Sequence, residues 1–230
     1  MLCIYWADLK GLTKNYDEKL NTLHESRAEK VKNYKMPEDK IRGLGAGLLL
    51  EKALEDYLKV NGENPMVKDA QGRYCVSYEY GPQGKPYLKE YPNVQFSLSH
   101  SGMRAMVALS DTEVGLDVQQ MCGYKDKIVK RFYHKNEQEV LFELTDDVQR
   151  EKLFYDIWCC KEAYIKYTGQ GMGQDLRDFY ADFKSDDIVL ASGEAVAKYK
   201  ILQTEDDGYC QAVVFHKKIT NIDKFIKILL

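Results

Sequence analysis

Hydrophobic and polar residues alternate in several short segments of the chain, and this period of two predicts β-strands. The first segment is LCIYWADL at the start of the chain. The next two, FSLSHS and AMVALS, flank Gly102 and predict a hairpin with a tight turn. Further strands are predicted in VGLDVQQ, FYADF, AVAKYKILQ and YCQAVVF, at residues 114–120, 179–183, 195–203 and 209–215.

Other stretches repeat their apolar residues at steps of three and four, which is typical of a helix packed by one face. One begins at Arg42 and ends at Asn61-Gly62, and another covers residues 126–144 with a break near His134. The most regular stripe lies in 150–167 and consists of Leu153, Ile157, Cys160, Tyr164 and Tyr167. The order strand, helix, strands, then helix, strands predicts an α+β fold rather than a doubly wound sheet.

Composition limits the classes of protein that this chain can represent. It has 230 residues, of which 44% are hydrophobic and 30% charged, as in ordinary globular proteins, so global disorder is excluded. The net charge of −3 argues against a generic nucleic-acid binder but leaves room for a local basic pocket. With no targeting segment and no run of 18 apolar residues, we expect a cytoplasmic protein without a membrane partner.

The six cysteines are scattered, and none forms a C-x-x-C pair. We therefore expect buried, reduced thiols rather than a zinc site. The glycines of GLGAG at 43–47 lack the spacing of a dinucleotide fingerprint, and helix packing is the role that we predict for them.

Three segments carry candidate chemistry, and the first is Ser99-His100-Ser101 at the end of a predicted strand. The strand end should present these polar side chains at a surface, while Phe96 and Leu98 enter the core. His100 could act as a base or bind a phosphate. The competing interpretation is a turn histidine bonded to the backbone.

The second segment is VGLDVQQ, in which Asp117 stands between apolar neighbours. A carboxylate in such a strand is costly to bury unless it is paired or bound to a metal ion. Asp117 and Gln119 fall on the same face, and two oxygen donors suit Mg²⁺. The alternative is an aspartate that caps a turn at the strand end.

The third segment is WCCKEAYIK at 158–166. Glu162 and Lys166 lie one helical turn apart, with Trp158 a turn earlier on the same side. The glycines that follow the helix would let a ligand approach the backbone closely. The alternative is an ordinary exposed ion pair between Glu162 and Lys166.

In order and spacing, these segments resemble the 4′-phosphopantetheinyl transferases of the larger, Sfp-like class. The family pattern has F-x-x-S-H-S, then G-I/V-D-I/V-E, then W-x-x-K-E-A/S-x-x-K and a glycine turn. The chain has FSLSHS, GLDVQ and WCCKEAYIK followed by TGQGM, and Gly84-Lys85-Pro86 stands where the family has G-K-P. The resemblance covers roughly residues 20–215, including a basic segment that leads to Arg42.

The resemblance implies a pseudo-dimer of two similar α+β lobes, residues 1–110 and 111–230, with the substrate cleft between them. It also implies an enzyme that moves the 4′-phosphopantetheine arm of coenzyme A to a serine of an apo acyl or peptidyl carrier protein. The other product would be 3′,5′-ADP, and the reaction would depend on Mg²⁺. We expect a monomer that acts in fatty acid, polyketide or nonribosomal peptide biosynthesis and binds no nucleic acid.

The same resemblance implies roles for individual residues. Asp117 and Glu162 would coordinate Mg²⁺ with Gln119, and Lys166 would contact the phosphate that develops charge. Glu162, or a water that it orients, would take the proton of the carrier serine. The residues implied to bind coenzyme A are Ser99, His100, Lys85, Pro86, Arg42, Arg27 and Lys30.

Two positions depart from the family pattern. Gln119 stands where the family often has Glu, which keeps an oxygen donor and removes a charge. Gly43 replaces a hydroxyl residue that is common in the family, and the resemblance implies the loss of one phosphate contact there. The departures leave two other hypotheses open: a non-catalytic module that binds coenzyme A or a carrier protein, and an unrelated Mg²⁺-dependent phosphoesterase.

Lysines and one arginine cluster between residues 125 and 131, interleaved with and followed by Ile128, Val129, Phe132 and Tyr133. Carrier proteins of this family's reaction are usually acidic around the modified serine. An apolar strip with a basic rim would suit an acidic helix, so we predict that this segment docks the carrier. The alternative is a solvated basic face over a strip packed into the core. The basic residues are Lys125, Lys127, Lys130 and Arg131.

Overall fold

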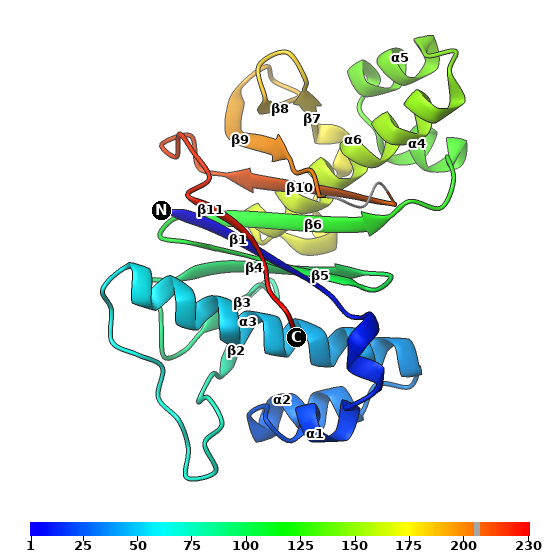
Figure 1. Cartoon of the computed structure of the whole chain (residues 1–230). Coiled ribbons are helices and arrows are strands. Elements are labelled where there is room, and N and C mark those ends of the chain that lie inside the picture. Colours follow the sequence, from blue (N-terminus) through cyan, green and yellow to red (C-terminus); the bar gives the residue numbers. More distant parts are fainter. Residues whose placement is uncertain (205–207) are drawn as a thin grey trace. The chain divides into compact units, whose positions relative to one another are not determined.

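The computed structural model describes residues 1–204 and 208–230 and has the predicted α+β architecture (Figure 1). The chain divides into two units, each with its own sheet and hydrophobic core. The first unit consists of Met1–Gly81, Pro86–Thr112 and Asn221–Leu230, and the second of Pro82–Lys85 and Glu113–Thr220.

The sheet of the first unit has the strand order β11-β1-β5-β4. β1 (Leu2–Asp8) and β4 (Gln95–Ser101) both pair antiparallel with the central β5 (Arg104–Ser110). The predicted turn of the β4–β5 hairpin is confirmed, since Gly102 has a φ of 53°. β11 (Lys224–Lys227) pairs parallel with β1, a pairing that the sequence pattern did not predict.

Helix α3 (Pro37–Val60) packs along this sheet against β5, β1 and β4 (Figure 1). It begins five residues before Arg42, so the predicted start was wrong. Proline is well tolerated in the first turn, where its missing N–H has no helical partner, and acidic residues follow it there. The first unit also contains η1 (Lys10–Thr13), α1 (Tyr16–Leu20), α2 (Glu25–Lys32), β2 (Tyr78–Tyr80) and β3 (Pro86–Leu88).

The glycines of GLGAG lie within α3 and have the packing role that the sequence predicted. A Cβ added at Gly43 would lie 2.5 Å from the ring of Tyr34, and one at Gly45 would collide with Leu9. Since these neighbours are side chains of the first unit's core, the glycines let α3 approach the segments around it.

The sheet of the second unit has the strand order β6-β10-β9-β8-β7. β6 (Val114–Gln120) pairs antiparallel with β10 (Tyr209–Phe215), and helix α6 (Asp147–Thr168) packs on both strands. Asp146 accepts a hydrogen bond from the amide of Gln149 and caps α6, which therefore begins three residues before the predicted start. The other elements are α4 (Asp126–Phe132), α5 (Lys135–Glu143), η2 (Gly171–Gly173), η3 (Leu176–Asp178), β7 (Phe179–Asp182), β8 (Asp187–Leu190) and β9 (Ala195–Ile201).

Each unit includes a strand, a long helix and a pair of antiparallel strands in the same sequential order. In the first unit these are β1, α3 and the pair β4 and β5, and β5 lies between β1 and β4 in the sheet. In the second they are β6, α6 and the pair β9 and β10, and β10 lies between β6 and β9. The pseudo-dimer and the lobe division at residues 110 and 111 stay predictions. No helix in the described part of the chain is both long and apolar enough to cross a membrane.

The expectation of buried thiols is confirmed for Cys3, Cys159, Cys160 and Cys210. It is wrong for Cys122, which is exposed two residues after the end of β6, and for Cys75, which is half-buried. All six cysteines are free thiols, as predicted.

Candidate active site

Strand β6 and helix α6 make a close approach at Gly115. A Cβ at this position would collide with the carbonyl oxygen of Ala163 and would lie 2.5 Å from the backbone nitrogen of Tyr167. Ala163 and Tyr167 directly follow Glu162 and Lys166 in the helix. The missing side chain therefore lets the strand lie against the part of α6 that carries the predicted site residues.

Asp117 lies in the middle of β6, opposite Ala212 of β10, and only 2% of its surface is exposed. One carboxylate oxygen, Oδ1, accepts from Lys166 Nζ at 2.7 Å, and Oδ2 accepts from Gln119 Nε2 at 3.0 Å. The shared face of Asp117 and Gln119 is thus confirmed. The turn-cap alternative is wrong, because Asp117 lies within the β6–β10 ladder and its buried carboxylate accepts from Lys166 of α6 and from Gln119.

Glu162 lies close enough to Asp117 for the two carboxylates to influence each other. Burial raises the pKa of Glu162, the negative charge of Asp117 raises it further, and Lys166 opposes the shift. The ion pair of Lys166 is made to Asp117 on the strand, so the alternative of a simple surface pair along α6 is wrong. Two carboxylates and one ammonium group therefore share one site between β6 and α6.

A cavity of about 840 Å³ opens beside this cluster, entirely within the second unit. Trp158, Glu162 and Lys166 all line it, which confirms that they share one side of α6. Phe132 packs edge-on against Trp158, with ring centroids 6.2 Å apart. Gly171 and Gly173 also line the cavity, in the glycine turn that the sequence predicted a ligand to approach, as does Arg131 at the end of α4. The sequence pattern missed the lining residues that follow this turn: Gln174, Asp175, Leu176 and Arg177.

The donor chemistry of the cluster fits a hard divalent cation. Asp117 and Glu162 offer carboxylate oxygens and Gln119 offers an amide oxygen, and oxygen is the ligand that Mg²⁺ prefers. Among the residues described, no group of three or more His, Cys, Asp or Glu side chains could hold a metal ion. A site here would rely on two carboxylates, with phosphate and water as the remaining ligands.

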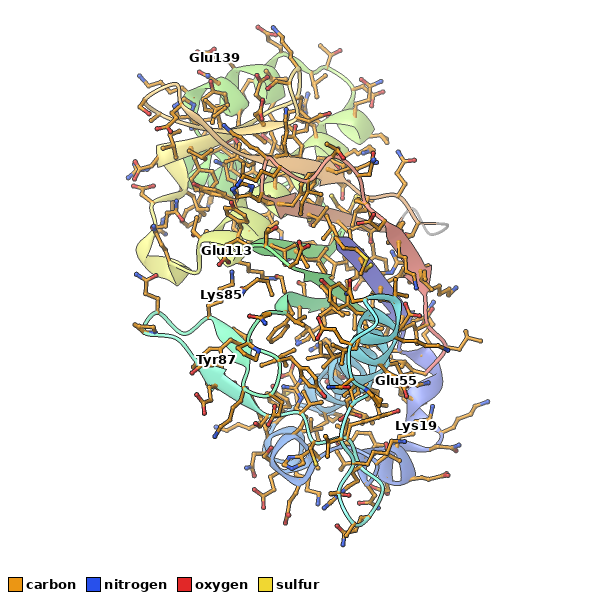
Figure 2. All side chains as sticks on the ribbon, turned by 90° about the vertical axis from the view of Figure 1, so that its left-hand side faces the viewer. Lys19, Glu55, Lys85, Tyr87, Glu113 and Glu139 are labelled. Carbon is orange, nitrogen blue, oxygen red and sulfur yellow. The ribbon has the colours of Figure 1, made fainter. Side chains whose placement is uncertain are left out.

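Lys85 lies at the C-terminal end of α6, also in the second unit. Its ammonium forms an ion pair with Glu113 at 2.8 Å, and the two side chains are labelled in Figure 2. The same ammonium donates to the carbonyl of Tyr167 at 3.0 Å. Its stem packs over Gly169, where an added Cβ would lie 3.0 Å from Lys85 Cδ. Lys85, which the sequence predicted to bind the nucleotide, thus contacts the residue that directly follows Lys166 in α6.

Four other residues predicted to bind coenzyme A lie in α2, α3 and β3 of the first unit. A terminal nitrogen of Arg27 donates to the carbonyl of Gly43 at 3.2 Å, and Arg42 is paired with Asp39 at 2.6 Å. Lys30 donates to the hydroxyl of Tyr80 at 2.9 Å. Tyr80 in turn stands opposite the fourth residue, Pro86, in the β2–β3 ribbon.

Ser99 and His100 lie within β4 rather than in the turn, so the turn-histidine alternative is wrong. Their side chains point to opposite faces of the sheet. His100 is exposed as expected, but Ser99 is buried, with 6% of its surface accessible, and its predicted surface position is wrong. Phe96 lies in the core and Leu98 packs partly against it, as predicted.

Comparison with known proteins identifies the family. Residues 113–215 match the model of the 4′-phosphopantetheinyl transferase superfamily. The chain is 30% identical over 199 residues to the 4′-phosphopantetheinyl transferase HetI of Nostoc sp., covering 84% of this chain and 78% of HetI. It is 28% identical over 177 residues to Sfp of Bacillus subtilis, covering 71% of this chain and 78% of Sfp.

A solved structure also resembles part of the chain. The holo-[acyl-carrier-protein] synthase of Thermotoga maritima superposes with a TM-score of 0.37 and 20% identity, covering 46% of this chain and 64% of that one. This similarity is too low to support a fold assignment. The sequence relationships to transferases over most of their length are sufficient, and the chain belongs to the 4′-phosphopantetheinyl transferase superfamily of enzymes.

Proposed function

We propose that this protein transfers the 4′-phosphopantetheine arm of coenzyme A to a serine of an apo carrier protein and releases 3′,5′-ADP. The observation that carries the proposal is the cluster of Asp117, Glu162 and Lys166 beside a cavity of about 840 Å³. Transfer of a phosphoryl-linked group needs positioning and charge neutralisation more than covalent help from the enzyme. The two carboxylates and the lysine supply charged groups that can position the phosphates and neutralise their charge.

Asp117 and Glu162 are the residues that would hold Mg²⁺, with Gln119 as a further oxygen donor. Bound there, Mg²⁺ would neutralise charge on the pyrophosphate of coenzyme A. Because Gln119 stands where the family often has Glu, the proposed metal site has one negative charge fewer than is usual in the family. The proposed site therefore depends on Asp117 and Glu162 for its net negative charge.

Lys166 is the residue that we assign to the phosphate at which negative charge develops. Its ammonium is oriented by Asp117 Oδ1 at 2.7 Å, and 31% of its side chain is exposed, so it can also reach a ligand in the cavity. A positive group that is already held in place stabilises developing charge without first having to reorganise.

Glu162 is the candidate base for the proton of the carrier serine, either directly or through a water that it orients. A carboxylate with a raised pKa accepts a proton more readily than an ordinary glutamate. Burial and the neighbouring Asp117 raise the pKa of Glu162 in this way, and the side chain lines the cavity. The place of Glu162 in the cavity wall and the direction of its pKa shift therefore support this assignment.

For the nucleotide part of coenzyme A, we propose Arg27, Lys30 and Arg42 together with the β4 pair Ser99 and His100. Their basic groups would neutralise the negative charge of the ligand's phosphates, and the hydroxyl group would donate a hydrogen bond to them. Lys85, with Pro86 beside it, completes this set. An ammonium group has three N–H donors. The contacts of Lys85 with Glu113 and Tyr167 use two of them, which leaves one for a phosphate.

For the carrier protein, we propose the basic face of α4. Lys127, Lys130 and Arg131 are exposed there, while Ile128 and Phe132 are partly buried against the core of the second unit. Arg131 also lines the cavity. An acidic carrier that docks on this face would therefore bring its serine toward Glu162. We further propose that the protein acts as a cytoplasmic monomer on acyl or peptidyl carriers.

Mass spectrometry of an apo carrier protein tests the proposed reaction. The carrier is incubated with the protein, coenzyme A and Mg²⁺, and its intact mass is measured. A gain equal to the mass of the phosphopantetheine arm, together with released 3′,5′-ADP, supports the proposal. An unchanged carrier in the presence of tightly bound coenzyme A would instead indicate a non-catalytic binding module.

A further inference from the structure

A buried ion pair lies directly beside the candidate site and has no role in the proposed chemistry. Lys161, which precedes Glu162 in α6, contacts Glu137 of α5 at an N–O distance of 2.7 Å. The exposed fractions of the two side chains are 0% and 1%. Burial lowers the pKa of Lys161 and raises that of Glu137, and each charge partly offsets the shift of the other.

The hydrogen bonds of Lys161 extend beyond this pair. Its ammonium donates to the carbonyl oxygens of Leu176 and Phe179, both at 2.8 Å. With Glu137 as the third acceptor, all three N–H donors are used. Lys161 thus connects α6 to η3 and to the first residue of β7.

One of the two carbonyls held by Lys161, that of Leu176, belongs to the segment that forms part of the cavity wall. Gln174, Asp175, Leu176 and Arg177 all line the cavity that Glu162 and Lys166 also line. This segment follows Gly169 and Gly171, whose φ angles of 71° and 61° lie in the left-handed region that favours glycine in turns. Contacts to α6 are therefore needed to fix the distance between this wall segment and the helix.

We propose that Lys161 is a positioning residue, which anchors the cavity wall at 174–177 to α6 immediately next to Glu162. The carbonyl contacts distinguish this role from a contribution to stability alone. Glu137 balances the buried charge of Lys161 and accepts a hydrogen bond from the amide of Ala181 in β7. The carbonyls of Leu176 and Phe179, in contrast, accept from the ammonium of Lys161. Two substitutions can therefore separate charge balance from anchoring.

The experiment compares Lys161→Met with Glu137→Gln. Lys161→Met removes the donors to both carbonyls, whereas Glu137→Gln removes the balancing charge and leaves those donors in place. Both changes should lower the midpoint of thermal unfolding. Lys152→Met is the matched control, since Lys152 lies on the same helix and pairs with Asp156 at 2.8 Å but is largely exposed.

Two measurements follow for each folded variant. Amide hydrogen exchange should become faster at residues 174–179 in Lys161→Met only. The kcat for transfer, which rests on the proposed function, should fall about tenfold in Lys161→Met, with the KM for coenzyme A within about threefold of the native value. Glu137→Gln and Lys152→Met should keep nearly native kcat values at temperatures where they are folded.

Equal kcat values for Lys161→Met and Glu137→Gln, or unchanged exchange at 174–179, would overturn the proposal. If Lys161→Met does not fold, Lys161→Gln takes its place, because its amide has donors but no charge and is too short to hold both carbonyls. Its kcat should still lie below that of Glu137→Gln, and equality would again reject the anchor. If the native protein shows no transfer at all, the proposed function fails, while the exchange measurement still decides the anchoring role.

Discussion

Replacing Gly115 by alanine tests whether the close approach of β6 and α6 builds the candidate site. The added Cβ would collide with the carbonyl oxygen of Ala163 and lie 2.5 Å from the nitrogen of Tyr167. Both are backbone atoms, so no side-chain rotation can relieve the overlap. The helix must move away from the strand, and Lys166 must move with it away from Asp117.

The expected effects follow from the size of this overlap. Overpacking of this kind costs about 1–3 kcal/mol of folding free energy. A displacement of roughly 1 Å at a catalytic group can lower a rate by about a hundredfold. Lys166 Nζ now lies 2.7 Å from Asp117 Oδ1, and a displacement of that size would break the hydrogen bond. We therefore expect Gly115→Ala to fold with reduced stability and to lose transfer activity by about two orders of magnitude.

The assay measures steady-state transfer to an apo carrier over a range of Mg²⁺ concentrations, with thermal unfolding of the same samples. Gly11→Ala is the control, because nothing lies within 4 Å of a Cβ at that position. It should change neither activity nor Mg²⁺ dependence. A Gly115→Ala protein with kcat and Mg²⁺ dependence like the native values would show that the close approach does not position the site.

Four further predictions concern the metal, the nucleotide, the carrier and stability. Gln119→Glu restores a carboxylate beside Asp117, so it should be tolerated and should tighten Mg²⁺; a loss of tenfold or more at every Mg²⁺ concentration would contradict this assignment. His100→Ala and Arg42→Ala should raise the KM for coenzyme A more than they lower kcat; if both keep their full defect with dephospho-coenzyme A, neither contacts the 3′-phosphate. Reversal of Lys127 and Arg131 to Glu should raise the KM for the carrier only, most strongly at low salt; an unchanged value there would exclude α4 from docking. Burial raises the pKa of Glu51 to about 8, so the folded protein binds a proton that the unfolded chain releases and loses stability as pH rises from about 4.5 to 8; Glu51→Gln should unfold at a higher temperature than the native protein at pH 8 but not at pH 4, and equal shifts at both would refute the linkage.

The local parts of the fold could be predicted from the sequence because their signals are local. The strand 114–120 has the predicted bounds, and alternation along it correctly placed Asp117 and Gln119 on one face. Helical spacing likewise placed Glu162 and Lys166 on one side of α6. Such patterns need only the period of the backbone and no knowledge of which elements meet.

The contacts between elements could not be predicted in the same way. The ion pair of Asp117 with Lys166 joins residues 49 positions apart and requires the approach of α6 at Gly115. A glycine inside a strand is a signal of close backbone approach, and it could have drawn attention to Gly115. The parallel pairing of β11 with β1 joins the two ends of the chain, and nothing in its four residues indicates the partner strand.

Lys161 shows the same limit for a single side chain. A lysine in a helix is ordinarily assigned to the surface, because burying its charge is costly without a partner. Its partner Glu137 lies on another helix, and its two carbonyl acceptors lie beyond the glycine turn. Only the assembled second unit shows that this lysine is enclosed.

The most direct test of the proposed metal site is the transfer rate of Asp117→Ala and Glu162→Ala at saturating coenzyme A, carrier and Mg²⁺. We expect each variant to unfold cooperatively, like the native protein, but to leave the mass of the apo carrier unchanged within the time in which the native protein modifies it completely. Loss of a metal ligand costs several kcal/mol at the transition state, which is a factor of about a thousand or more in rate. Near-native modification of the carrier by either variant would contradict the assignment of the metal site to this pair of carboxylates.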